Sequence, residues 1–202
     1  MNGVSRSIVY FNQSGVENTD EVVDIVYDRL KQGDIKSVVV ASSRGGTGLK
    51  FARKMAGETN LVVVSSHPGQ SSPGVWSFDL NALKELESKG CKVVKQSHIL
   101  SGLDRSISAK FSGTSYPEFL AEALRCLFGV GMKVAIECAI MAADSGAIPI
   151  DKTIAVGGSS SDRGKGADCA IVVWPSHFNN FFDFRVLEIL AKPFRRDIKK
   201  EG

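Results

Sequence analysis

Residues 37–48 read SVVVASSRGGTG, a short β-branched run followed by three glycines set among hydroxyl side chains. The three consecutive valines are typical of a strand that is covered on both faces. The glycines that follow allow the chain to turn tightly and to start a helix at once. We therefore interpret this stretch as a buried strand that leads through a glycine-rich loop into a helix, the basic step of an α/β sheet.

Similar apolar runs recur along the chain, and helical patterns separate the first four of them. The predicted strands are Ile8–Phe11, Ser37–Ala41, Leu61–Ser65, Cys91–Lys95, Thr153–Val156 and Ala170–Trp174, with a weaker candidate at Val186–Ala191. Strands that alternate with helices at these spacings predict βαβ crossovers. We therefore expect an α/β fold of three layers, α/β/α, around a mostly parallel sheet.

Apolar periodicity and helix-terminating residues predict the helices. Val22, Val26 and Leu30 share one face of a helix that Asn18 and Glu21 would open as a capping box. Further helices are expected from the glycine-rich loop to Gly57, over residues 79–89, from Ser115 to about 129–131, and over 132–143. The last is apolar on nearly every side, which indicates burial. Because two successive helices precede the final strands, we expect the sheet to end in a mixed edge.

Length and composition fit one globular domain. The chain has 202 residues, of which 43% are hydrophobic and 23% charged, close to ordinary globular averages. We expect a single α/β domain over residues 1–202, with a basic tail at 195–202. The balance of 25 basic against 22 acidic residues lacks the dense basic stripe of a nucleic-acid-binding protein, so no nucleic-acid partner is expected.

The sequence also indicates a reducing, aqueous environment. The four cysteines are scattered without a CxxC pair, as is usual for reduced thiols in a cytosolic protein. The N-terminal residues lack the apolar stretch of a signal peptide, and no run reaches the roughly 18 apolar residues that span a bilayer. We expect a cytoplasmic protein with no membrane partner, and an edge strand with buried-looking helices would allow a homo-oligomer.

The glycine-rich loop over 42–48 is the strongest candidate binding site. Backbone N–H groups at a helix N-terminus, with glycines and hydroxyl groups around them, hold phosphate without a metal ion, and Arg44 would add charge. The loop lacks the Lys-Ser/Thr ending of a Walker motif and the third glycine of GxGxxG. The alternative is a tight turn that needs glycine for its geometry alone.

All three histidines follow the end of a predicted strand, and each is preceded by a serine: His67, His98 and His177. If those strands are parallel neighbours, the imidazoles share the sheet edge at which ligands bind in open α/β proteins. Histidine there can act as base, acid or hydrogen-bond donor. The alternatives are polar loop residues satisfied by their neighbours, or a three-histidine zinc site, for which no local spacing speaks.

Charged residues near this edge allow two interpretations each. Arg105 either binds an anionic ligand or pairs with Asp104 at the start of a surface helix. Glu137 lies in the most apolar helix, with Asp144 seven residues later on nearly the same face. Because a buried carboxylate is costly without a partner, Glu137 is either ion-paired for structure or faces the ligand.

Two further stretches stay open between a structural and a functional interpretation. Residues 157–166, GGSSSDRGKG, are either a lid over the site or an ordinary surface loop. Residues 177–183, HFNNFFD, carry three aromatic side chains that either belong to the core or stack on a flat ring of a ligand. Motifs of serine hydrolases, zinc proteases, EF-hands and kinases are absent from the sequence, so no motif names a reaction.

Residues 17–19, 42–48 and 61–66 resemble the C-terminal, allosteric α/β domain of pyruvate kinases, in which the corresponding Ser/Thr/Gly loop holds a sugar phosphate. Including 96–102 (QSHILSG) and 141–149 (MAADSGAIP), the whole chain is similar to a small family of stand-alone archaeal proteins that are named for this domain and have no assigned activity. The resemblance implies flavin mononucleotide (FMN) in the cleft. Because the pyruvate kinase barrel is missing, kinase activity is not implied.

The leading hypothesis is therefore a protein that binds FMN at the carboxyl edge of the sheet. The residues expected at the site are Ser42, Ser43, Arg44, Gly45, Gly46, Thr47, Gly48, His67, Ser97, His98 and Arg105. If the protein is a flavin-dependent enzyme, His98 is the first candidate for proton transfer and Glu137 the second. The alternatives are a non-catalytic sensor of a sugar phosphate or nucleotide, and a metal-dependent hydrolase at the histidine edge.

Overall fold

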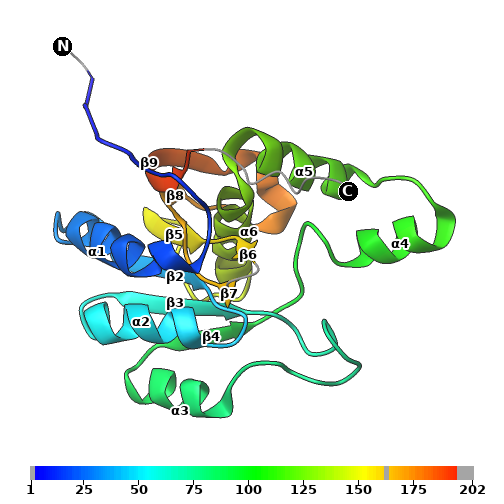
Figure 1. Ribbon diagram of the computed structural model, residues 1–202, viewed down its shortest axis with the longest axis horizontal. Coiled ribbons are helices and arrows are strands. Elements are labelled where there is room, and N and C mark those ends of the chain that lie inside the picture. The colour runs from blue at the N-terminus through cyan, green and yellow to red at the C-terminus, as the bar shows by residue number, and fades with distance from the viewer. Residues whose placement is uncertain (1–2, 162–163, 195–202) are drawn as a thin grey trace.

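In the computed structural model, which describes residues 3–161 and 164–194, seven strands form one sheet in the order β1-β9-β8-β5-β2-β3-β4 (Figure 1). The strands are β1 (Val9–Phe11), β2 (Ser37–Ala41), β3 (Asn60–Ser65), β4 (Lys92–Lys95), β5 (Thr153–Gly157), β8 (Cys169–Trp174) and β9 (Arg185–Pro193). A separate hairpin consists of β6 (Ser160–Ser161) and β7 (Gly164–Lys165). The basic tail predicted at 195–202 lies outside the described residues.

Helices flank both faces of the sheet. On one face lie α1 (Thr19–Leu30), α2 (Gly46–Met55) and α3 (Leu80–Ser88), and on the other α6 (Val130–Asp144), which α5 (Tyr116–Phe128) covers in turn. The short helix α4 (Leu103–Phe111) projects away from the sheet (Figure 1). Two 3-10 turns, η1 (Val16–Asn18) and η2 (Phe178–Asp183), complete the elements.

The sheet is mixed but mostly parallel, as the sequence predicted. Of its seven strands, β8 alone runs antiparallel to its neighbours, so the other six point the same way. The expectation that the mixed pairing lies at an edge is wrong. The antiparallel strand sits inside the sheet between β5 and β9, and both edge strands, β1 and β4, are parallel to their neighbours. The edge on the β9 side is formed by β1, from the opposite end of the chain.

The alternation of side chains along β2 explains why both of its faces are covered. Val38 and Val40 pack into the cluster beneath α1 and α2, whereas Val39 packs against α6, and all three are fully buried. Full burial of a valine side chain contributes about 1.5–3 kcal/mol. Helix α6 is buried as predicted, because it lies across β2, β3, β5 and β8 beneath α5.

The capping box predicted at the start of α1 is absent, whereas α5 begins with one. At α5 the box is present: the Ser115 hydroxyl accepts from the Glu118 N–H at 3.3 Å, and the Glu118 carboxylate accepts from the Ser115 N–H at 3.2 Å. At α1 it is absent, because Asn18 already has helical backbone angles at the end of η1. Its side-chain amide donates instead to the Gln13 carbonyl at 2.8 Å.

A buried guanidinium ties the end of α1 to β9. Arg29 is 5% exposed and bonds the carboxylates of Asp34 and Glu188, each at 2.7 Å. Its hydrogen bonds lower the pKa of Asp34 and of Glu188 below their usual values. The cluster therefore joins two elements that are far apart in the sequence.

Arg29→Met should destabilise the protein by about 2 kcal/mol at pH 7, because both carboxylates lose their buried partner and keep only the more exposed Lys152 and Arg6. Since the pKa values of Asp34 and Glu188 are lowered by folding, the unfolded chain binds their protons more readily in acid. The stabilisation of the folded protein by the Arg29 cluster is complete above about pH 4.5. It is lost as the pH falls through the pKa values of Asp34 and Glu188 in the folded state. Urea unfolding at pH 7 and pH 3 should thus show a smaller pH dependence in the variant.

The exposed pair of Lys31 and Asp28, with side chains 57% and 70% exposed, provides the control. Lys31→Met should change the free energy of unfolding by less than about 0.5 kcal/mol. An Arg29→Met variant with the acid sensitivity of the unmodified protein would contradict the assignment.

Candidate functional site

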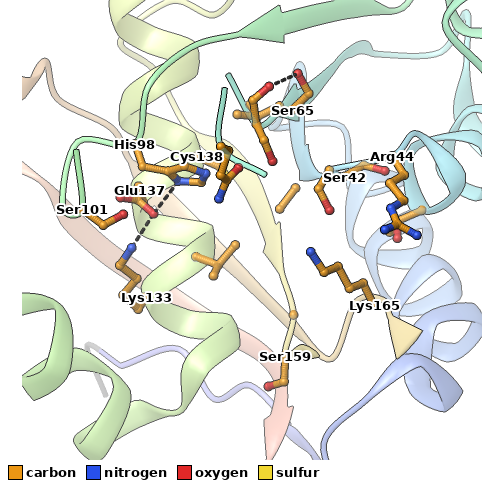
Figure 2. Close-up of a pocket in the computed structure, with 18 of the residues that line it drawn as sticks. Ser42, Arg44, Ser65, His98, Ser101, Lys133, Glu137, Cys138, Ser159 and Lys165 are labelled. Carbon is orange, nitrogen blue, oxygen red and sulfur yellow. Dashed lines mark hydrogen bonds and ion pairs between the residues drawn. The ribbon is translucent and has the colours of Figure 1, made fainter. Parts of the chain in front are cut away.

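A pocket of about 720 Å³ opens where β2, β3 and β5 end. Its walls come from the loops after β2, β3, β4 and β5, from β7, and from α4, α5 and α6. Figure 2 shows two groups of residues facing each other across it: Ser42 and Arg44 on one side, and His98, Glu137 and Lys133 on the other. The carboxyl edge of the parallel strands thus carries the pocket, as open α/β sheets favour.

The glycine-rich loop forms the first of these walls. Ser42 is buried, and its hydroxyl accepts from the Gly48 N–H at 3.1 Å, so it satisfies a donor in the first turn of α2. The N–H groups of Gly46 and Thr47 belong to the same turn, have no acceptor within the helix and lie at the pocket. This wall can therefore offer backbone donors and the positive end of the helix dipole to an anion.

The three glycines of the loop have different reasons to be glycine. Gly45 has φ +97°, and a Cβ there would lie 2.6 Å from that of Ala82. A Cβ on Gly48 would lie 2.9 Å from Val63, so both residues allow α2 to pack closely. Gly46 has no positive φ, and a Cβ there would meet nothing within 4 Å. The geometry of the turn therefore accounts for Gly45 and Gly48 but not for Gly46, which faces the pocket.

Glu137 organises the opposite wall. It is 1% exposed, and its carboxylate accepts from His98 Nδ1 at 3.1 Å, from the Leu100 N–H at 2.8 Å and from the Lys133 ammonium. Burial by itself raises the pKa of Glu137, but the hydrogen bond from His98 and the charge of Lys133 outweigh it, so the pKa is lowered. Glu137 is therefore ionised at neutral pH.

Lys133 is a pocket residue that our sequence analysis did not identify. It is 3% exposed, lies one helical turn before Glu137 and lines the pocket. Burial lowers the pKa of its ammonium, and the charge of Glu137 offsets part of that effect. The signal was present in the sequence: a lysine four residues before a glutamate on an apolar helix is placed to be its ion-pair partner.

Most of the residues expected at the site do meet there. Those that line the pocket are Ser42, Ser43, Arg44, Gly46, Thr47, His98, Arg105 and Glu137, whereas Gly45 and Gly48 lie behind the loop surface. His67 and Ser97 are not among the lining residues, and His67 Nδ1 lies 2.7 Å from its neighbouring carbonyl, that of Pro68. In the described part of the chain, no ion pair joins Arg105 to Asp104.

His177 does not share this edge, which corrects the expectation for the three histidines. It follows β8, and because β8 is antiparallel its carboxyl end lies at the opposite edge of the sheet. There His177 Nδ1 lies 3.0 Å from the Asp144 carboxylate, at the end of α6. A zinc site made of all three histidines is therefore excluded, and residues 3–161 and 164–194 contain no group of three or more metal-binding side chains.

The aromatic stretch over 177–183 follows His177 to that opposite edge. Phe178 is 51% exposed and Phe182 86% exposed, whereas Phe181 packs partly against the apolar cluster around α6. These rings cannot stack on a ligand in the pocket. The alternative, that all three belong to the core, is also wrong, because η2 turns two of them outward.

The stretch over 157–166 forms part of the pocket wall. Ser159, directly before β6, and Lys165, in β7, line the pocket. Both ends of the stretch pack closely: a Cβ on Gly157 would overlap the Gly131 carbonyl, and one on Gly166 would overlap the Thr19 hydroxyl. The glycines at its ends therefore serve packing against α6 and η1.

The charge of the pocket is strongly positive. Five of its lining residues are cationic, and among the described residues the single carboxylate that lines it is Glu137. The cations are Arg44, Arg105, Arg125, Lys133 and Lys165. Such a wall attracts an anionic ligand and offers it several hydrogen-bond donors.

Comparison with models of known protein families finds none that matches the chain. Within the described residues, no helix combines the length and apolarity needed to cross a bilayer.

The glycine assignment leads to a matched pair of stability predictions. Gly45→Ala should destabilise the protein by about 1–3 kcal/mol, because it forces a side chain into a left-handed backbone and against Ala82. Gly46→Ala should be neutral or stabilising by up to about 1 kcal/mol, since a helix favours alanine. Urea unfolding measures both, and a Gly46→Ala variant as unstable as Gly45→Ala would show that the fold itself requires Gly46.

Proposed function

We propose that this protein binds a phosphorylated small molecule, with its phosphate at the N-terminus of α2. One observation carries the proposal: Gly46 lacks a side chain at a position where the fold would accept one, and that position faces the pocket. A phosphate there would accept from the N–H groups of Gly46 and Thr47 and meet the positive end of the helix dipole.

The charges around the loop support the same ligand class. Arg44 and Lys165 stand on the loop side of the pocket (Figure 2). Arg105 from α4 and Arg125 from α5 also line it. The bound ligand would carry at least one full negative charge. Its remaining atoms would meet Ser101, Ser159 and the residues around Glu137.

FMN is the ligand that the resemblance to the α/β domain of pyruvate kinases and its stand-alone archaeal relatives favours. The pocket volume of about 720 Å³ lies within the range of small-molecule sites, roughly 300–1,000 Å³. The loop would hold the phosphate, and His98 and Arg105 would lie along the rest of the ligand. Bound flavin would supply the redox chemistry, and the protein would orient it and tune its potential.

A sugar phosphate or nucleotide is the second candidate, and the lining of the pocket favours it. Of the described residues that line the pocket, none is phenylalanine, tyrosine or tryptophan, and hydroxyl and charged side chains predominate. Such walls match the hydroxyl groups of a sugar better than a flat, apolar ring. In this case the protein would be a sensor or an enzyme without flavin.

An absorbance scan of protein purified without added ligand distinguishes the two candidates. If FMN is bound, the protein is yellow, and mass spectrometry of the supernatant after denaturation gives the FMN mass. If the protein is colourless and releases no flavin, a thermal-shift screen of sugar phosphates and nucleotides should raise its melting temperature. The proposal is contradicted if the protein releases no phosphorylated molecule and no phosphorylated compound raises its melting temperature.

Gly46→Asp tests the phosphate site directly. The variant should fold, because an acidic residue is favourable in the first turn of a helix and a Cβ has room there. Its carboxylate should lower the affinity for inorganic phosphate and for FMN at least about 10-fold, equivalent to about 1.4 kcal/mol. Calorimetric titration measures the affinity.

Gly3→Asp is the matched control, since a Cβ on Gly3 also meets nothing within 4 Å and Gly3 does not line the pocket. It adds the same charge to the chain and should leave the affinity unchanged. Equal affinities of the Gly46→Asp and Gly3→Asp variants would place the phosphate elsewhere.

A further inference from the structure

The wall opposite the glycine-rich loop carries groups that phosphate binding leaves unused. His98, Glu137 and Lys133 are joined by hydrogen bonds and line the same pocket as the loop (Figure 2). A ligand whose phosphate lies at α2 would extend across the pocket toward them. Their chemistry therefore bears on what happens to the far end of that ligand.

Lys133 has donors to spare. An ammonium group carries three N–H donors, and within the described part of the chain its one hydrogen-bond acceptor is Glu137. The side chain is 4% exposed and lines the pocket. Two donors on a buried cation can therefore bind a ligand oxygen and stabilise negative charge that develops on it.

Glu137 determines which nitrogen of His98 can act on a ligand. The ionised carboxylate accepts a hydrogen bond from Nδ1 of His98 at 3.1 Å, so the proton of the neutral imidazole is held on Nδ1. The other nitrogen, Nε2, has no hydrogen-bond partner among the described residues and carries the lone pair. A histidine held in this tautomer is a general base, and the side chain is 22% exposed, so a ligand can reach it.

A structural role accounts for only part of this cluster. Glu137 also accepts from the Leu100 N–H at 2.8 Å and so anchors the loop after β4. That bond needs neither a buried ammonium nor an imidazole. Apolar residues of similar size usually stabilise a protein interior at least as well as a buried ion pair does. A base and a cation side by side in a cavity are, however, the two groups that removal of a proton next to a carbonyl requires.

We propose that this wall catalyses proton transfer on a phosphorylated hydroxy-aldehyde or hydroxy-ketone, an inference that rests on the phosphate site proposed above. Nε2 of His98 takes the proton from the hydroxyl-bearing carbon next to the carbonyl. The electron pair of that C–H bond forms a C=C bond, and the carbonyl π pair moves to oxygen, where the Lys133 ammonium stabilises the charge.

The imidazolium of His98 then returns its proton. If the proton returns to the same carbon, the substrate is restored. It carries a hydrogen from solvent when the imidazolium has exchanged its proton with water. Return to the former carbonyl carbon, with the hydroxyl proton moving to the other oxygen, interconverts the hydroxy-ketone and the hydroxy-aldehyde. The atoms and electrons balance without an oxidant or reductant. Glu137 acts as a positioning residue, because it holds both partners and does not touch the substrate.

The test is hydrogen exchange in D2O, followed by proton NMR with dihydroxyacetone phosphate, ribose 5-phosphate and fructose 6-phosphate as probes. The full-length protein should exchange the hydrogen next to the carbonyl in at least one of them. His98→Gln should lower kcat at least about 100-fold, and Lys133→Met should do the same. Glu137→Gln, which keeps an acceptor for the Leu100 N–H, should lower kcat with KM unchanged.

His67→Gln is the control, since His67 lies near the same edge without lining the pocket; it should exchange at the unmodified rate. Thermal shifts with the same three probes separate the possible failures. A probe that stabilises the protein but never exchanges, or exchange that survives His98→Gln, overturns the catalytic inference and leaves the phosphate site standing. If no probe stabilises the protein, this inference fails together with the sugar-phosphate form of the proposed function.

Discussion

Helix α6 covers one face of the sheet, and the close contact between the two constrains most of what surrounds it. Gly131 and Gly157 allow the helix backbone to approach the end of β5, where a Cβ on Gly157 would overlap the Gly131 carbonyl. A helix this deeply buried can carry charge only if the charge is paired and hydrogen-bonded. Lys133 and Glu137 meet that condition one turn apart, so α6 can stay buried and still present charged groups to the pocket.

The ion pair in turn shapes the wall of the pocket. The two carboxylate oxygens of Glu137 accept hydrogen bonds from three donors: the Leu100 N–H, the His98 ring and the Lys133 ammonium. The first holds the loop after β4, which leads into α4 and so to Arg105. Without that carboxylate, the His98 imidazole and the Lys133 ammonium would lose the acceptor that positions them.

The two walls differ in how they are built. The loop before α2 relies on backbone: Ser42 satisfies one N–H of the first turn, and glycines at 45 and 48 bring the helix close to α3 and β3. The opposite wall relies on side chains from α6 and from the loop after β4. Backbone donors suit a phosphate, which needs no proton transfer. Titratable side chains suit the part of a ligand where bonds change.

The amino-acid sequence predicted the strands of the main sheet, most of the helices and the position of the glycine-rich loop, whereas only the folded chain shows which residues face one another. The valine run predicted β2 and the uniformly apolar pattern predicted α6, because an element that is buried on all sides consists mostly of apolar residues. The direction of β8 was not predictable from its own residues, since an apolar strand reads the same in either direction. That direction moved His177 to the opposite edge. The four-residue spacing of Lys133 and Glu137 allowed their ion pair to be predicted from the sequence. The position of Lys133 in the pocket could not be predicted, because it depends on where α6 packs on the sheet.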